Sequence, residues 1–405
     1  MKILVLNSGS SSQKSALYEI GGSLPEHPAT PVWHGTIEWS GDRAKVQTWG
    51  SGEVEQRREL AVRSREKAIE ELVSTLWSGK NPRVTSKSDV DVVGHRIVHG
   101  GSEFCEPVVI TPEVKAGIGR MAVFAPLHNR AELDGIEIIE KQMSGVPQVA
   151  VFDTGFHRTL PEPARVYPGP YEWLQRGIRR YGFHGINHAY CAGRVAQLLD
   201  KNVGELKIVS CHLGNGCSLA AIHGGSSVDT TMGFTPLEGL MMGTRSGSVD
   251  PGILTFLMRE DRVNAERLDD MLNKDSGLLG VSGVSGDMRE IVSAMKAGNQ
   301  RARLAFDIFV HRLRKGIGEM IAVFGGCDAL VFTAGIGENS AEVRAAACKS
   351  FGFAGVRLDA RKNAEVSPDA DIAAADSQVR ILVVRAQEDW AIAQESWRLM
   401  RARGQ

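Results

Sequence analysis

The sequence predicts an α/β protein built from two related lobes. Apolar strand-like runs alternate with helical patterns along the chain, a mixture that favours α/β lobes over a helix bundle or a β-sandwich. A strand–turn–strand unit at residues 3–17 returns 205 residues later at residues 208–222, about half of the 405 residues away. A chain of this length has room for two domains, each with its own core.

The two copies of this unit align without a gap. The alignment pairs Ile3 with Ile208, Gly9 with Gly214, and Leu17 with Ile222. Each copy reads as an apolar strand, a polar glycine turn and a second strand. Glycines lack a Cβ atom, so backbone N–H groups at such turns can approach an anion closely. One turn in each lobe predicts a nucleotide held in a cleft between the lobes.

Composition excludes several classes of protein. Apolar residues make up 42% and charged residues 23% of the chain, which is ordinary for globular proteins. The net charge of −1 provides no field for nucleic acid or an anionic membrane. The six cysteines form no C-x-x-C pair, so we interpret them as buried thiols in a reducing compartment. No run is long enough for a signal peptide or a membrane span, and we expect a cytoplasmic protein.

The first half of the chain follows the opening hairpin with strands and amphipathic helices. Apolar residues at helical spacing after Ser64 predict the first clear helix. The predicted elements are antiparallel strand over 32–49, a helix over 64–77, a strand at 90–93, helices over 112–124 and 131–143, and a strand at 146–152.

The second half of the chain contains residues that are typical of helix starts. Asn187 is predicted to cap a helix through Leu199, and Asp250 followed by Pro251 predicts another helix start. A long helix is expected from Asn299 toward residue 324, strands at 329–333 and 379–384, and a final helix over 389–401. The segment 335–339 lacks the third glycine of a dinucleotide fingerprint. It still fits a strand–turn–helix nucleotide contact, with Asn339 as a cap.

Chemically useful side chains stand at strand ends and glycine turns. Arg245 is surrounded by Gly, Ser and Thr, which leaves room for a bidentate oxyanion. Arg96 and Asp153 each follow an apolar strand, where site residues concentrate. His184 has basic neighbours, which favour the neutral ring. Lys14 follows a serine-rich turn but lacks the second glycine of a P-loop, so a Walker A site is excluded.

Taken together, the motifs resemble the acetokinase family. In the family's order they are LNSGSSSQK, GHRIVHGG, APLHN, VFDTGFH, RRYGFHG, HLGNG, SVDTTMGFTPLEGLMMGTRSG, SGDMR, FTAGIGENS and QED, and they cover almost the whole chain. The resemblance implies two duplicated ribonuclease-H-like lobes with ATP between them, the actin-like ATPase fold. Residues 1–152 would form an acyl-substrate and Mg²⁺ lobe, with a C-terminal helix over 386–405 packing back on it, and residues 153–385 a nucleotide-binding lobe.

The resemblance also implies an activity and its residues. The expected reaction is reversible, Mg²⁺- or Mn²⁺-dependent transfer of the γ-phosphoryl group of ATP to acetate, giving acetyl phosphate and ADP, in a homodimer. The implied catalytic residues are Arg96, His128, Asp153, His184 and Arg245. The implied acyl-substrate residues are Arg96, Val98, Leu127, Phe183 and Pro236. The implied nucleotide contacts are Lys14, His212, Leu213, Gly214, Asn215, Gly216, Asp287, Met288, Arg289, Gly335, Ile336, Gly337, Glu338 and Asn339. Asn7 and Glu388 would serve Mg²⁺, which prefers oxygen ligands.

Departures from the family pattern spare these residues. Gln13 stands for the usual Leu, Arg130 for Pro, Ile186-Asn187 for Thr-Ser, and Gln387-Glu388-Asp389 for Asn-Glu-Glu. A Val at position 98 resembles acetate kinases more than propionate kinases, which use a smaller residue there.

Three alternatives stay open from the residues alone. One is a related kinase that phosphorylates a sugar hydroxyl and therefore needs a general base. Another is a nucleotide-driven binding protein, in which Arg96 and Arg245 would have no role. The third is a nucleic-acid binder resting on Arg176, Arg179 and Arg180, although three basic residues in a neutral chain are more typical of a solvated turn.

Overall fold

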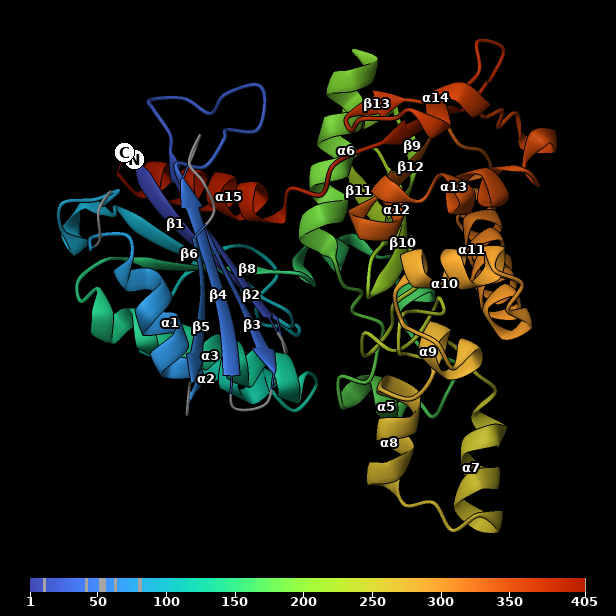
Figure 1. Ribbon diagram of the computed structural model, residues 1–405, viewed down its shortest axis with the longest axis horizontal. Helices are drawn as coiled ribbons and strands as arrows, with labels where there is room; N and C mark the ends of the chain where they lie inside the picture. Colours follow the sequence, from blue (N-terminus) through green and yellow to red (C-terminus); the bar gives the residue numbers. More distant parts are fainter. Residues whose placement is uncertain (10–11, 41–42, 51–55, 62–63, 79–81, 405) are drawn as a thin grey trace. The chain divides into compact units, whose positions relative to one another are not determined.

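The structure, a computed structural model, describes residues 1–9, 12–40, 43–50, 56–61, 64–78 and 82–404 (Figure 1). The chain divides into two compact units. Unit 1 comprises Met1–Gly155 and Gln387–Gln405, and unit 2 comprises Phe156–Ala386. Within these described ranges, no helix combines the length and the apolar character needed to cross a bilayer.

Unit 1 is built on a mixed sheet. Its strands are β1 (Lys2–Ser8), β2 (Ser12–Glu19), β3 (Trp33–Ser40), β4 (Arg43–Gly50), β5 (Gln56–Ala61), β6 (Val92–Ile97), β7 (Val108–Val109) and β8 (Gln148–Phe152). Their order is β5-β4-β3-β2-β1-β6-β8-β7. Strands β1 to β5 pair antiparallel in sequence order, whereas β6 and β8 continue the sheet parallel to β1. The antiparallel strands predicted over 32–49 are confirmed.

Helices cover both faces of this sheet. They are α1 (Arg65–Ser74), α2 (Pro112–Met121), α3 (Pro126–Gln142) and α15 (Glu388–Arg403), with the short 3₁₀ helix η1 (Lys87–Asp89). On one face Leu4 and Leu6 share a core with Leu72 of α1 and Ile139 of α3. On the other face α15 approaches so closely that a methyl group on Gly94 would lie 2.5 Å from the Ser396 Oγ atom. The last helix therefore belongs to the core of the first unit.

Unit 2 repeats the sheet of unit 1. Its strands are β9 (Lys207–Leu213), β10 (Cys217–His223), β11 (Ser226–Thr230), β12 (Ala329–Thr333), β13 (Ala370–Asp371) and β14 (Arg380–Val383). The order β11-β10-β9-β12-β14-β13 matches β3-β2-β1-β6-β8-β7 strand for strand. In both sheets the first three strands are antiparallel, the next two run parallel to the first, and the edge strand is antiparallel again. The predicted duplicated α/β fold is confirmed.

The pairing also corrects the gapless alignment of the two hairpins. Ser8 pairs with Gln13 in the first hairpin, whereas Leu213 pairs with Cys217 in the second. The first turn is therefore one residue longer, and the equivalence of the second strands shifts by one position. A one-residue shift exchanges the two faces of a strand, so the structural match needs a gap in the turn.

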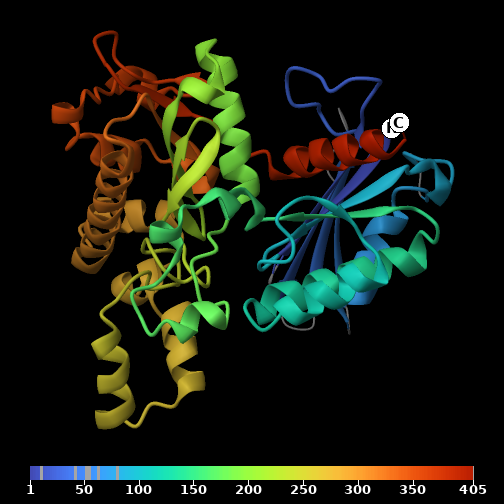
Figure 2. The same ribbon diagram turned by 180° about the vertical axis from the view of Figure 1, so that it is seen from behind.

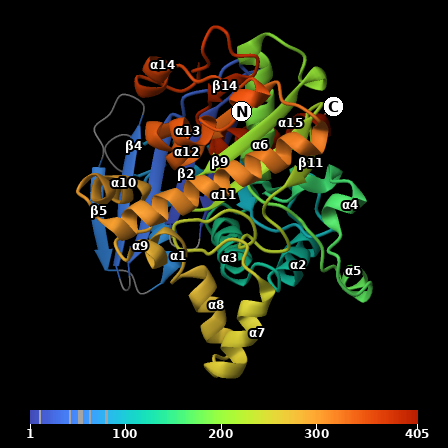
Figure 3. The ribbon, with the colours of Figure 1, turned by 90° about the vertical axis from the view of Figure 1, so that its right-hand side faces the viewer.

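The helices of unit 2 lie on both faces of its sheet. They are α4 (Glu162–Arg165), α5 (Glu172–Gln175), α6 (Gly185–Leu199), α7 (Pro251–Glu260), α8 (Ala265–Asn273), α9 (Gly277–Ser282), α10 (Met288–Lys296), α11 (Gln300–Phe324), α12 (Ala334–Asn339), α13 (Ala341–Cys348) and α14 (Ala360–Ala364), with the 3₁₀ helices η2 (Gly155–Thr159), η3 (Val203–Glu205) and η4 (Gly352–Ala354). Helix α6 packs Cys191 and Val195 against Ile208 and Ile222. Helix α11 crosses the other face (Figure 3), and α7 and α8 extend away from the sheet (Figure 2).

Helix ends test the predicted caps. Asp250 and Asn299 cap α7 and α11 through side-chain bonds to backbone N–H groups, as predicted. Two predictions were wrong. Helix α6 begins before Asn187, because His184 takes the left-handed conformation and starts the helix at Gly185. Asn339 ends α12 instead of capping the next helix, and Ser340 caps α13.

Candidate active site

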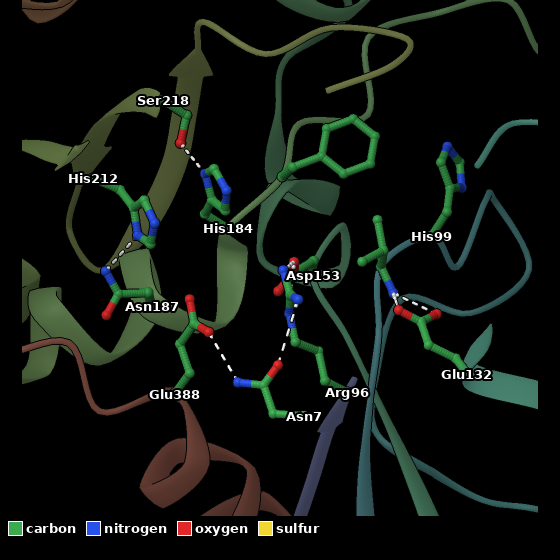
Figure 4. Close-up of polar contacts among 12 residues, drawn as sticks. Asn7, Arg96, His99, Glu132, Asp153, His184, Asn187, His212, Ser218 and Glu388 are labelled. Carbon is green, nitrogen blue, oxygen red and sulfur yellow. Dashed lines mark hydrogen bonds and ion pairs between the residues drawn. The ribbon is translucent and has the colours of Figure 1, made fainter. Parts of the chain in front are cut away.

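In unit 1, three predicted residues gather at one edge of the sheet. Asn7 lies near the end of β1, Arg96 near the end of the parallel strand β6, and Asp153 directly after β8. Parallel strands bring their carboxyl ends to the same edge, which is why these distant residues meet. Arg96 donates to Asp153 Oδ2 from both Nε, at 3.1 Å, and NH2 (Figure 4). Its NH1 atom lies 3.5 Å from Asn7 Oδ1.

This ion pair is largely removed from solvent. The Asp153 side chain is 1% exposed and that of Arg96 14%. Burial opposes the guanidinium charge, but Asp153 and Glu388 together raise the pKa of Arg96 above its ordinary value. The arginine is therefore a permanent, oriented cation at the sheet edge.

A second acidic group faces Asn7 from the start of α15. The Asn7 Nδ2 atom donates to Glu388 Oε2 at 3.1 Å and to Asp389 Oδ1 at 2.9 Å. Burial raises the pKa of Asp389, and the charge of Glu388 adds a smaller effect in the same direction. The hydrogen bond from Asn7 and the charge of Lys14 partly offset this shift. Two neighbouring carboxylates suit a divalent cation, and rotation of the Asn7 amide would add a third oxygen ligand. In the part of the chain that the structure describes, no group of three or more His, Cys, Asp or Glu side chains could hold a metal ion.

Glu132 of α3 carries a buried carboxyl group and was not among the site residues predicted from the sequence. Both of its oxygens accept from the backbone N–H of Val98, at 3.1 and 3.2 Å. Burial raises the pKa of Glu132 to about 8, although Arg96 and the Val98 N–H oppose the shift. Glu132 thereby holds the segment that follows Arg96.

We expect Glu132→Gln to change how stability depends on pH. Because the folded pKa of about 8 lies above the ordinary value of 4.5, the folded state binds the proton more tightly, and wild-type stability falls as pH rises between these values. The fall is at most about 1.4 kcal/mol per pH unit for one group. The amide still accepts from Val98 without titrating. The melting temperature of Glu132→Gln, relative to that of the wild type, should therefore rise as the pH increases from 5 to 8.

The matched control is Glu140→Gln, on the exposed surface of the same helix. The difference in melting temperature between Glu140→Gln and the wild type should vary little over the same pH range. If the difference in melting temperature between Glu132→Gln and the wild type is equally independent of pH, the elevated pKa of Glu132 is contradicted.

The remaining residues selected in unit 1 lie near the same edge. Val98 is 4% exposed and follows β6, and His128 lies in the first turn of α3. Lys14 is exposed on β2, opposite Asn7 in the strand pairing. The side chain of Leu127 lies outside the described part of the structure. Arg130, a departure from the family pattern, points to solvent on α3.

In unit 2, His184 sits in an unusual backbone conformation. Its φ of 56° and ψ of 22° are left-handed, a region that few non-glycine residues adopt and that recurs at functional sites. The ring stacks on His212, with centroids 4.0 Å apart and 9° between the planes. Its Nδ1 atom lies 2.9 Å from Ser218 Oγ (Figure 4). His184 is thus positioned by backbone, stacking and a hydrogen bond.

Arg245 lies beside the glycine turn of residues 214–216. Its NH1 atom donates to the backbone oxygen of Pro236 at 3.0 Å. A methyl group on Gly216 would lie 3.3 Å from His184 Nε2 and 3.6 Å from Arg245 NH1. The space next to Gly216 is therefore bordered by a histidine nitrogen and a guanidinium group, an arrangement suited to an anion.

A cavity of about 730 Å³ adjoins the glycine turn at Gly214 and Asn215. It is lined by Gly214, Asn215, Gly286, Asp287, Met288, Arg289, Val292, Gly335, Ile336, Asn339, Ser340 and Glu342. Its volume lies within the range of small-molecule sites, and it combines apolar walls with a few polar groups. Eight of the predicted nucleotide contacts are among these residues.

Other predicted contacts do not line this cavity. Leu213 is fully buried in β9, and His212 stacks on His184. Gly337 and Glu338 form the end of α12, where their carbonyl groups accept from the buried Arg344.

Several site residues were missed, and most had a usable pattern. Glu132 falls on the buried stripe of α3 with Ile136 and Ile139, which marks an acidic residue facing inward. His188 follows His184 by four residues, the spacing that places two side chains on one helix face. Asp389 adjoins Glu388. Gly286 and Ser340 stand in the quoted motifs SGDMR and FTAGIGENS, whereas Val292 and Glu342 had no pattern that separates them from ordinary helix residues.

The duplicated fold, the cavity and the adjoining histidine and arginine define a nucleotide-dependent phosphotransferase. A family model described as the acetokinase family matches residues 2–394. An acetate kinase of Cyanothece sp. is 54% identical over 407 residues, covering all of both chains. The crystal structure of Porphyromonas gingivalis acetate kinase superposes with a TM-score of 0.90 at 40% identity, covering 98% of this chain and 99% of that one. That of a propionate kinase from Francisella tularensis gives 0.89 at 36% identity, with the same coverage of each chain.

The chain belongs to the acetokinase family. It is a kinase whose phosphoryl acceptor is a carboxyl group, and ATP and ADP are the nucleotides of the family.

Proposed function

We propose that this chain transfers the γ-phosphoryl group of ATP reversibly to acetate, giving acetyl phosphate and ADP. The observation that carries the proposal is that the nucleotide cavity and the His184–Arg245 pair adjoin the same glycine turn. Gly214 and Asn215 line the cavity, and Gly216, at the end of the same turn, adjoins His184 Nε2 and Arg245 NH1. A nucleoside in the cavity would direct its phosphates along this turn toward His184 and Arg245.

The acceptor needs no general base. A carboxylic acid has a pKa of about 4, so acetate is already ionised at neutral pH. One of its oxygens forms the new bond to the γ-phosphorus while the bond between this phosphorus and the β–γ bridging oxygen breaks. The electron pair of that bond leaves with ADP. This chemistry separates the reaction from phosphorylation of a sugar hydroxyl, which requires proton removal.

The main task is bringing one anion onto another. Arg245 of unit 2 would neutralise charge on the equatorial oxygens of the phosphoryl group, and His184 would donate a hydrogen bond to them. Arg96 of unit 1 would bind the acetate carboxylate. Asp153 holds Arg96 through two hydrogen bonds to one oxygen, which supports a role in orienting the guanidinium group. We assign His128, in the first turn of α3, to the same reaction on the family resemblance.

Mg²⁺, or Mn²⁺, would be held by Glu388 and Asn7, and we add Asp389 to this set because it shares the Asn7 contact. The ion supplies charge neutralisation of the nucleotide phosphates. Lys14, which lies across the strand pair from Asn7, would contribute a further positive charge to these phosphates.

Substrate size would be set by small apolar contacts with the acetate methyl group. We assign these contacts to Val98, Leu127, Phe183 and Pro236. Val98 and Phe183 are both buried, at 4% and 1% exposure. Unit 1 would then serve the acyl substrate and the metal, and unit 2 the nucleotide. We further propose that the protein is cytoplasmic and that it forms a homodimer. Sedimentation of the purified protein would test the dimer.

The test is to trap acyl phosphate with hydroxylamine in the presence of Mg·ATP. Acetate, propionate, butyrate and a reaction without acid are run side by side. We expect acetate to give the most hydroxamate. Hydrolysis of ATP with no hydroxamate from any acid would overturn the proposed reaction.

Val98→Ala sharpens this test. Removing methyl groups beside the acyl chain should shift preference toward propionate, since one methylene in a pocket is worth about 10-fold or more in kcat/KM. The backbone N–H of residue 98 keeps its contact with Glu132. An unchanged ratio of acetate to propionate would remove Val98 from the acyl site.

A further inference from the structure

Behind His184 lies a chain of buried side chains joined by hydrogen bonds. Ser218 Oγ lies 2.9 Å from His184 Nδ1 and 2.8 Å from His188 Nε2. The second ring nitrogen of His188 lies 2.9 Å from Ser210 Oγ. Ser210, His188 and Ser218 are all 0% exposed. We call these three residues the relay.

For a neutral His184 ring, the bonds at Ser218 allow only two arrangements of protons. A hydroxyl group carries one proton, so it can donate to only one of the two rings it contacts, and the other ring must donate to its oxygen. Burial, reinforced by His157 and His212, lowers the pKa of His188 well below its ordinary value, so this ring stays neutral with one N–H and one acceptor nitrogen. The proton on His184 is therefore coupled to the proton on His188.

In the first arrangement, Ser218 donates to His184 Nδ1, and His188 donates to Ser218 from Nε2. Ser210 then donates to the acceptor nitrogen of His188. The remaining proton of His184 lies on Nε2, the atom that faces the space beside Gly216. In the reverse arrangement, that atom presents a lone pair, which repels a phosphoryl oxygen.

The far end of the relay favours the first arrangement. Ser210 also interacts with the Cys191 thiol, which Thr333 contacts too. Burial raises the pKa of this thiol to about 12, so it remains protonated. In the reverse arrangement the Ser210 hydroxyl would turn its proton toward sulfur, a weak acceptor. In the first arrangement it goes to an imidazole nitrogen, and the thiol donates to Ser210. The stronger set of hydrogen bonds is obtained when His184 carries its proton on Nε2.

We propose that the relay fixes the proton of His184 on Nε2, so that this nitrogen donates a hydrogen bond to the transferring phosphoryl group. Ser210, His188 and Ser218 are positioning residues, since none adjoins the space beside Gly216. The inference rests on the proposed role of His184 in phosphoryl transfer. It adds that the tautomer of His184 is set by the protein before substrate arrives, which avoids reorganisation during the reaction.

The first test is spectroscopic and uses the unaltered enzyme. Ring-¹⁵N-labelled histidine reports which nitrogen of each neutral ring carries the proton, and the His184 signals are those lost in His184→Gln. We expect His184 to carry hydrogen on Nε2 and to accept at Nδ1. The opposite pattern, or an even mixture, would overturn the proposal even if no relay variant folds.

The second test is Ser218→Ala, with Ser227→Ala as the matched control. Ser227 is also a fully buried serine of unit 2, and its hydroxyl lies 2.8 Å from Nδ1 of His157, outside the relay. We expect Ser218→Ala to lower kcat by about 10-fold, less than the 10²–10³ expected when a donor itself is removed, with KM for ATP nearly unchanged. Its His184 signals should move toward a tautomer mixture. Ser227→Ala should keep both kcat and the wild-type signals.

His184→Ala distinguishes failure of this inference from failure of the proposed site. If His184→Ala retains full activity, the role of His184 in phosphoryl transfer is wrong. If it loses activity while Ser218→Ala matches Ser227→Ala in kcat and in tautomer, the site stands and the relay is overturned.

Discussion

Arg245→Ala is expected to lower kcat by about 10²–10³, the loss typical of removing one donor to a developing charge. The KM for ATP should change little, because the nucleoside contacts of the cavity lined by Asn215, Met288 and Ile336 are untouched. Such a split indicates an interaction made in the transition state and not in the ground state. Steady-state hydroxamate formation at saturating acetate measures it.

Arg245→Lys separates charge from geometry. A lysine keeps the positive charge but loses the planar fork, so we expect an intermediate loss of about 10-fold or more. Arg312→Ala is the matched control, because Arg312 NH1 also donates to a backbone oxygen of unit 2, that of Ser248, at 3.0 Å. It should keep wild-type kcat. A rise in KM alone for Arg245→Ala would show that Arg245 only binds substrate.

The fold was predictable because its duplication survives in the local sequence. The apolar run and glycine turn at residues 3–9 and 208–214 are short-range patterns, and the structure builds the same hairpin from each. The one-residue difference between the turns was not predictable, because a gapless match of side-chain types looks equally good before strand pairing is known. Register depends on which residues face each other across the turn, and that is a property of the folded hairpin.

Start residues of helices were predictable where a side chain makes the cap. Asp250 and Asn299 bond to N–H groups two or three residues ahead, so the sequence carries the whole interaction. Helix α6 differs, because His184 begins it with a left-handed backbone and no side-chain cap. This conformation is held by stacking on His212 and by the Ser218 contact, both of which require distant strands.

The candidate site divides in the same way. Arg96 and Asp153 were selected because each follows an apolar strand, but their hydrogen bonds exist only because β6 and β8 are parallel neighbours. The role of Glu132 depends on burial of its carboxyl group against the backbone of Val98, which residue type does not reveal. Residues that act through a second residue are therefore the ones that the sequence leaves unassigned.

Asp153→Asn and Arg96→Ala should each lower kcat by about 10²–10³. If Asp153 acts by orienting Arg96, the double variant should be no worse than Arg96→Ala alone, because the carboxylate has no function once the guanidinium group is gone. Two independent roles would instead multiply, giving a loss of about 10⁴–10⁶. Full activity of Asp153→Asn would remove Asp153 from the site altogether.

Stability must be controlled, because breaking a buried ion pair costs about 3–5 kcal/mol. Asp369→Asn provides the control, since Asp369 accepts from Arg194 at 2.6 Å and both side chains are 11–12% exposed in unit 2. It should lower the melting temperature by an amount comparable to Asp153→Asn while keeping kcat. The losses in kcat of the two single variants could instead multiply in the double variant, although the protein melts no lower than this control. That result would assign Asp153 a direct contact with substrate or metal in addition to its hydrogen bonds with Arg96.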